Sequence, residues 1–236
     1  FRVDVSDIRD MWILQAGQPD KTDQLLGLLP RLLQDELPRA RGGFIYDAFE
    51  ESGVVMFHAV RARDGLPEAA RALLESLRGH GADALLTDCR NLGGLERIRR
   101  AYTLNERALR TAKKIFPLKP LFTLFELRFA DECIKRIEAG DDSARQAMEM
   151  LEAIPGDGGI SYGDMLKTLF AYYLDADRSA AAAAELLFVH KNTIQYRIKK
   201  FHELIADDLG GMLEVNELLM ALAIGRILES DRKSRS

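Results

Sequence analysis

The chain of 236 residues has few of the residues that mark metal sites, disulfide-rich proteins or membrane spans. Its two cysteines, Cys89 and Cys133, lie far apart and lack the paired spacing of a zinc site, which favours reduced structural thiols. The four histidines show no HExxH spacing, so a metal hydrolase is unsupported. No run approaches the roughly 18 apolar residues of a membrane span, and no signal segment opens the chain. We therefore expect a cytoplasmic protein that needs neither a metal nor another cofactor and does not bind a membrane.

The length and composition of the chain favour more than one folded domain. A chain of 236 residues exceeds the usual size of a single domain, and 47% hydrophobic residues are enough to form buried cores. The formal net charge of -4 shows no overall positive field, so any surface for nucleic acid must come from a local concentration of cations. Because the sequence begins with Phe1 and not with Met, we expect it to be a fragment of a longer protein.

The most informative stretch is 179–205, SAAAAAELLFVHKNTIQYRIKKFHELI, which predicts two helices joined by a tight turn. Ser179 is a good N-cap for a first helix over 180–187, where alanines favour helix and allow close packing. A turn of three residues leads to a second helix over 191–205. The turn position that often holds glycine is Phe188, so we expect a turn that needs no positive φ.

The second helix of this stretch separates an apolar face from a cationic, amide-bearing face. Ile194, Ile198, Phe201 and Ile205 recur at helical spacing and predict the buried side. Between Phe188 and His202 there are four cations and no acid. Amide side chains suit adenine edges, and lysine and arginine suit guanine edges and phosphates, so an ordinary solvated helix is the less favoured alternative. The predicted DNA-binding residues are His190, Lys191, Asn192, Thr193, Gln195, Tyr196, Arg197, Lys199 and Lys200.

These residues carry a family resemblance. The segment from Met165 to Ile227, and most specifically FVHKNTIQYRIKK, resembles the C-terminal helix-turn-helix domain of the PucR/CdaR family of bacterial transcriptional regulators. The resemblance implies binding to double-stranded operator DNA in the major groove through a helix at about 191–205. One recognition helix contacts only a few base pairs, and DNA-binding proteins of this shape usually bind two half-sites, so we expect a homodimer. It also implies a small-molecule effector, which the sequence does not identify.

The N-terminal half alternates strand-like and helix-like segments. Apolar alternation and turn residues predict an α/β sandwich around one mixed sheet, in the order βαββαβαβ. The expected segments are strand 11–16, helix 20–37, strands 43–49 and 53–60, helix 66–79, strand 84–88, helix 95–116 and strand 118–122.

This order, together with the segment DALLTDCRNLGGLERIRRAYTLNERAL, resembles the GGDEF-like domain of many PucR/CdaR proteins. A working diguanylate cyclase would carry GG(D/E)EF in the hairpin, but this chain has FEESG. Trp12, Ile13 and Leu14 occupy the first strand, where a metal-binding Asp would be needed. We therefore expect a degenerate domain, and the turn residues Glu50 and Glu51 are more simply two solvated carboxylates.

Further helices complete the expected α+β organisation. Helices are predicted over 123–139 and 143–154, and then over 164–174, with Leu166, Leu169, Phe170 and Tyr173 on its buried side. The segment 215–228 is apolar nearly all round, which predicts a helix buried on several sides, either in the domain core or against a partner subunit. The expected domains are a degenerate GGDEF-like domain at 1–122, a helical linker at 123–155 and a helix-turn-helix domain at 156–236.

Two functions follow from this organisation. The first is a DNA-binding regulator without enzymatic activity. The alternative is a nucleotide or metabolite sensor, related to cyclic-dinucleotide proteins, whose helical tail contacts protein.

Overall fold

The computed structural model describes residues 8–37, 44–58, 66–140, 160–205 and 212–233, together with residues 142, 145, 146, 149 and 152. It divides into two compact units. Unit 1 contains Phe1–Ala112 and Lys119–Asp131, and unit 2 contains Lys113–Leu118 and Glu132–Ser236. The predicted helix over 143–154 and the glycine-rich boundary at 155–159 lie outside the described residues.

Unit 1 is built on a five-stranded mixed sheet with the strand order β2-β3-β1-β4-β5. The strands are β1 Ile8–Ala16, β2 Phe44–Phe49, β3 Ser52–His58, β4 Ala84–Cys89 and β5 Leu121–Thr123. Strand β1 pairs antiparallel with β3 and β4, β2 pairs antiparallel with β3, and β4 pairs parallel with β5. The predicted order of elements and the predicted mixed sheet are both confirmed.

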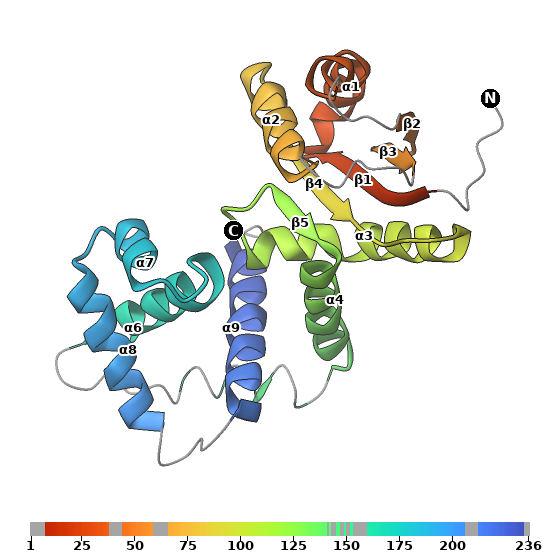
Figure 1. The fold of residues 1–236 in the computed structure, drawn as a ribbon. Coiled ribbons are helices and arrows are strands. Elements are labelled where there is room, and N and C mark those ends of the chain that lie inside the picture. Colours follow the sequence, from red (N-terminus) through yellow and green to blue (C-terminus); the bar gives the residue numbers. More distant parts are fainter. Residues whose placement is uncertain are drawn as a thin grey trace. The chain divides into compact units, whose positions relative to one another are not determined.

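Helices cover both faces of this sheet (Figure 1). On one face, α1 Thr22–Glu36, which follows the short helix η2 Pro19–Lys21, and α2 Leu66–Gly79 pack on Trp12, Leu14 and Phe57. On the other face, α3 Leu95–Ile115 packs on Met11 and Ile13 through Ile98 and Ala101. Because strand side chains alternate between faces, a strand buried on both sides is apolar nearly throughout, as β1 is.

The interface between α3 and the sheet also contains polar side chains, of which Gln15, Ser52, Thr87 and Asn105 are buried. The amide of Gln15 donates to Ser52 at 3.0 Å and to Glu106 at 2.6 Å. Next to it, the hydroxyl of Thr87 donates to Asn105 at 2.5 Å. These bonds fix the position of α3 over β1 and β4, because a buried polar group that lost its partner would destabilise the fold.

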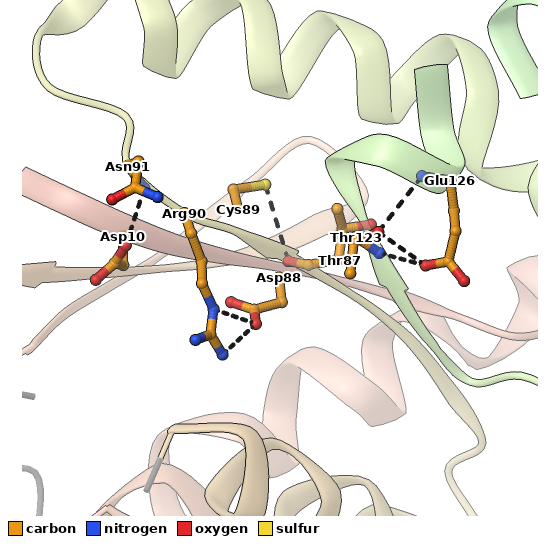
Figure 2. A network of polar contacts seen from close by, with 8 residues as sticks. All are labelled: Asp10, Thr87, Asp88, Cys89, Arg90, Asn91, Thr123 and Glu126. Carbon is orange, nitrogen blue, oxygen red and sulfur yellow. Dashed lines mark hydrogen bonds and ion pairs between the residues drawn. The ribbon is translucent and has the colours of Figure 1, made fainter. Parts of the chain in front are cut away.

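The carboxyl end of β4 and the start of the helix that follows β5 are held by side-chain contacts (Figure 2). Arg90 donates to Asp88 at 2.7 Å, and the backbone N–H of Asn91 donates to Asp10 at 3.1 Å. Helix α4, Leu124–Glu138, begins with a capping box. In it, Glu126 accepts from the backbone N–H of Thr123 at 2.8 Å, while the Thr123 hydroxyl accepts from the Glu126 N–H at 3.4 Å.

Unit 2 is helical over its described residues. It contains the end of α4, then α6 Tyr162–Leu169, the π-helical segment η3 Phe170–Asp175, α7 Ala180–Leu187, α8 Lys191–Ile205 and α9 Met212–Lys233. The predicted bounds of α7 and α8 are confirmed. So is the prediction that the last helix is buried on several sides, since its described core residues are Leu218, Met220, Ala221, Leu222, Ala223, Ile224 and Ile227.

The predicted burial of the first helix of unit 2 was partly wrong. Leu169 is buried as expected, but Leu166, Phe170 and Tyr173 are only half-buried. The core positions are instead Met165, Thr168, Leu169, Ala171 and Leu174. From Phe170 onward the segment is π-helical, and its wider turns change the rotation per residue, so the buried positions no longer follow the spacing of a regular α-helix. Leu166 lies before this segment, in the regular α6, whose buried side is formed by Met165, Thr168 and Leu169.

Both cysteines are buried and free, as the sequence predicted. Burial raises the pKa of the Cys133 thiol to about 12, and burial also raises the pKa of Cys89. In the described part of the chain, no group of three or more His, Cys, Asp or Glu side chains could hold a metal ion. A search of the same residues finds no helix with the length and apolar character needed to cross a bilayer.

Candidate nucleic-acid interface

Helix α7 begins at a tightly bonded turn that follows η3. The N–H of Arg178 donates to the carbonyl of Tyr172 at 2.8 Å, and the N–H of Ser179 donates to that of Ala176 at 2.7 Å. The Ser179 hydroxyl then accepts from the Ala182 N–H at 3.3 Å, which confirms it as the N-cap. The buried methyl groups of Ala183 and Ala184 allow α8 to pack closely against α7 (Figure 1).

The turn between α7 and α8 needs the positive φ that the sequence argument did not expect. Phe188 has φ 54° and ψ 41°, in the left-handed region. Its N–H bonds back to Glu185 at 3.3 Å, and the Val189 N–H bonds to Ala184 at 3.0 Å, which is the Schellman arrangement. This conformation ends the helix, because the two N–H groups satisfy its last carbonyls. These backbone hydrogen bonds hold Phe188 in the left-handed conformation even though the position is not glycine.

The side chain of Phe188 is 96% exposed, so no burial energy offsets the strain of its left-handed backbone. A left-handed conformation costs a residue with a Cβ roughly 1–2 kcal/mol, and glycine avoids most of that cost. We expect Phe188→Gly to raise the free energy of unfolding of unit 2 by about 1 kcal/mol, after the greater freedom of glycine in the unfolded chain is subtracted. Urea titration followed by far-UV circular dichroism measures this change.

Leu186 supplies the matched control for that substitution. It lies on α7 two residues earlier, is 39% exposed and has helical backbone. Leu186→Gly should lower the free energy of unfolding by about 1 kcal/mol, because glycine is unfavourable inside a helix. If both glycine variants lost stability equally, the turn at Phe188 would carry no strain.

His190 directly precedes helix α8 and acts as its N-cap. The Nδ1 atom of His190 accepts from the Asn192 N–H at 3.2 Å, and the His190 carbonyl accepts from the Thr193 N–H at 2.9 Å. The imidazole therefore has a structural role in addition to the DNA contact that we predicted for it. Its position at the start of α8 leaves it exposed beside Lys191.

The predicted binding side chains of α8 fall into two groups by exposure. Lys191, Asn192, Gln195, Tyr196 and Lys199 are exposed, while Thr193 and Lys200 are half-buried at the edge of the face. On the opposite side, Ile194, Ile198 and Phe201 are buried at 0%, 8% and 1% exposure. The exposed group carries two cations, two amides and a phenol, a set that can reach both phosphates and base edges.

Arg197 differs from the other predicted residues because its side chain turns toward α6. It is 17% exposed, its guanidinium donates to the Thr168 hydroxyl at 3.1 Å, and it lies 3.8 Å from the Asp164 carboxylate. The Thr168 hydroxyl in turn donates to the Asp164 carbonyl at 2.7 Å. In this conformation Arg197 braces α8 against α6.

Glu203 is an acid that the sequence argument left out, since it lies one residue beyond the acid-free stretch. It is 3.2 Å from the ammonium of Lys200 and 3.7 Å from that of Lys199. The hydrogen bond from Lys200 lowers the pKa of Glu203, so the carboxylate stays ionised. The positive field of α8 is therefore strongest at its N-terminal end, around Lys191, and weaker toward Glu203.

Comparison with known proteins agrees with this geometry. Residues 165–224, from α6 into α9, match the family model of the PucR C-terminal helix-turn-helix domain. The match indicates a helix-turn-helix of the kind found in bacterial DNA-binding transcriptional regulators. It covers less than half of the chain and does not include the N-terminal part, so the GGDEF-like resemblance stays a prediction.

Two other comparisons add little. No curated protein matches the chain. One of the solved structures that match is the crystal structure of a regulator of polyketide synthase expression from Bifidobacterium adolescentis. It is 16% identical, with 94% of this chain and 81% of that chain covered, and the TM-score is 0.32. A likeness at this level supports no inference about fold or function.

Proposed function

We propose that this protein is a bacterial transcriptional regulator that inserts α8 into the major groove of operator DNA. The observation that carries the proposal is the division of α8 into a buried apolar side and an exposed side with Lys191, Asn192, Gln195, Tyr196 and Lys199. The match to the PucR helix-turn-helix supports the same conclusion. No part of the proposal requires an enzymatic activity or a bound cofactor.

The exposed residues divide by chemistry into two roles. Asn192 and Gln195 carry amides that can bond two edge atoms of adenine, so we assign them to base recognition. Lys191, Lys199 and Lys200 are assigned to phosphates, with Thr193, Tyr196 and His190 completing the contacts to the backbone. Arg197 is assigned as a positioning residue, since its guanidinium is already bonded to Thr168.

Two further parts of the proposal concern assembly and control. A single recognition helix reaches only a few base pairs, so we propose that a homodimer binds two half-sites about one helical turn apart. We also propose that a small metabolite controls DNA binding. Neither part is needed for the test of DNA binding itself.

The test is selection of binding sites by the purified chain from a pool of random duplexes, followed by anisotropy titration of the selected duplex and a scrambled one. We expect at least about a thousandfold preference for the selected site at physiological salt. Equal binding to both duplexes, or binding to neither, would contradict the proposal and favour a helical tail that contacts protein.

Substitutions on α8 should separate the two roles. Asn192→Ala or Gln195→Ala should cost about 1–3 kcal/mol on the selected site and relax preference at one base position. Lys199→Ala should weaken binding to the selected and scrambled duplexes alike. It should also reduce the salt dependence of the affinity by roughly the contribution of one phosphate contact. Titrations at several salt concentrations measure both effects.

Arg71 offers a matched control for the loss of charge. It is exposed on α2, in the other unit, so Arg71→Ala removes one cation without touching α8. The affinity of the Arg71→Ala variant for DNA, and the salt dependence of that affinity, should equal those of the unchanged protein. Identical behaviour of Asn192→Ala and Lys199→Ala would show that the assigned roles are wrong.

A further inference from the structure

The residues that the structure describes leave part of one face of the unit 1 sheet uncovered along β2 and β3, on the side of α3. A pocket of about 450 Å³ lies there, between the hairpin and the N-terminal half of α3. Its volume falls within the roughly 300–1,000 Å³ of small-molecule sites in proteins. All of its lining residues belong to unit 1.

The floor of the pocket is a regular apolar surface. Met11, Met56 and Ile45 are cross-strand neighbours on β1, β3 and β2 and form one row of it. Val54 continues the floor, and Ile98 of α3 forms the adjoining wall. Met11 is 0% exposed and Val54 6%, so these side chains are ordered parts of the core. They support the half-buried Met56 and Ile45, which gives the floor a preformed surface.

The rim of the pocket carries a few polar groups, some of which already have hydrogen-bond partners within the protein. The carboxylate of Asp47 accepts from the Ala48 N–H at 2.9 Å. Glu50 is 3.5 Å from the hydroxyl of Tyr102, which lines the pocket beside Phe49. Arg99, exposed on α3, has no hydrogen bond or ion pair to any residue in the described part of the chain. Among the lining residues, Arg99 is therefore the cation that is available to a ligand, and Asp47 is the carboxylate.

We propose that this pocket binds a small molecule with a flat apolar body and a carboxylate or similar anion. The body would lie on Ile45, Val54 and Met56. The thioether of Met56 packs well against an aromatic ring. The anion would bond to the Arg99 guanidinium, which suits a carboxylate through two parallel hydrogen bonds. Calling this ligand the effector rests on the proposed function above, but binding in the pocket does not.

The test uses two fluorescent probes of the same shape. Anilinonaphthalene sulfonate is an aromatic anion, and N-phenylnaphthylamine is its neutral counterpart. Both should bind the full chain saturably, and naphthoate should displace both. Arg99→Gln should lower the affinity for the sulfonate about tenfold and leave the affinity for the neutral probe unchanged. No DNA is present, so the result is independent of whether the chain binds an operator.

Two sets of variants locate the binding. Arg100→Gln is the charge control, because Arg100 neighbours Arg99 but pairs with Glu96 at 2.9 Å and does not line the pocket. Val54→Trp should fill the pocket and abolish binding of both probes. Ile45→Trp, on the edge strand, serves as a second filling variant if the first is poorly folded. Circular dichroism shows whether each variant keeps its fold.

Each alternative outcome overturns the proposal. Equal effects of Arg99→Gln and Arg100→Gln would show that general charge attracts the sulfonate. Unchanged binding to both filling variants would place the probes elsewhere on the chain. Absence of binding, together with a dimer that Ile45→Trp converts to a monomer in sedimentation, would show that a second copy of the chain covers this face.

Discussion

Replacing Arg226 by Ala is expected to destabilise unit 2 by about 3–5 kcal/mol. Arg226 lies on α9 and binds both oxygens of Asp175 at 2.7 and 2.8 Å. It also donates to the Ile115 carbonyl at 2.8 Å and lies 4.6 Å from the centre of the Phe170 ring. The side chains of Arg226 and Asp175 are only 14% and 9% exposed, so removing one leaves the other charge buried without its partner.

The single tryptophan makes it possible to assign this loss to one unit. Trp12 is the only tryptophan of the chain and lies in unit 1. In a urea titration, Arg226→Ala should move the transition seen by far-UV circular dichroism to lower urea and leave the transition of Trp12 fluorescence in place. A fluorescence transition that moved by the same amount would show that the two units unfold together.

A double-mutant cycle tests whether the ion pair is the cause. Asp175→Ala should cost a similar amount, and the double variant should be little worse than either single one, because the second substitution removes an already unpaired charge. Arg226→Lys should lose part of the stability, since an ammonium cannot bind both oxygens and the Ile115 carbonyl in one plane. Additive losses in the double variant would contradict a direct coupling between Arg226 and Asp175.

No sequence argument could have found this pair. Asp175 and Arg226 are separated by 51 residues, and neither belongs to a local motif. Arg226 interrupts the apolar run 218–228 of α9, which marks it as unusual, but its partner depends on how η3 and α9 pack. Pairing of distant side chains follows from tertiary geometry, and single-sequence patterns report only local spacing.

Local spacing did predict the elements that carry the candidate interface. The bounds of α7 and α8, the cap at Ser179 and the buried side of α8 follow from propensity and period alone. The orientation of the Arg197 side chain toward α6 could not be predicted in this way. The helical angle placed this residue near the edge of the exposed face, but the hydroxyl of Thr168 on α6 draws its guanidinium inward.

Two predictions of backbone conformation were wrong for the same reason. The π-helical segment Phe170–Asp175 and the left-handed Phe188 are both irregular, and neither contains glycine or proline as a signal. Each is stabilised by contacts made after folding, such as the Arg226 bonds to Asp175 and the backbone bonds that end α7. In unit 1 the order of helices and strands along the chain was predictable, because apolar alternation and turns are local. The order of the strands within the sheet and the pocket beside the hairpin depend on tertiary packing and were not predicted.

Two aromatic residues on opposite sides of α8 provide the last prediction. Phe201 is 1% exposed in the core of unit 2, and Tyr196 is 47% exposed on the proposed DNA-binding side. Phe201→Ala should lower the free energy of unfolding by about 3–5 kcal/mol, through lost burial and the cavity that remains. Tyr196→Ala should change stability by less than about 0.5 kcal/mol, as a surface substitution does.

The two variants should behave in the opposite way toward DNA. Tyr196→Ala is expected to weaken the selected duplex by about 1 kcal/mol, the value of one hydrogen bond to the backbone, and Tyr196→Phe should lose the same amount if the hydroxyl makes it. Phe201→Ala should lose affinity only in proportion to the unfolded fraction, so cooling the sample should restore binding to this variant. Anisotropy at two temperatures, with circular dichroism on the same samples, measures both. A Tyr196→Ala variant that bound DNA normally while losing stability would place this side of α8 in the core and remove the basis for its role in the major groove.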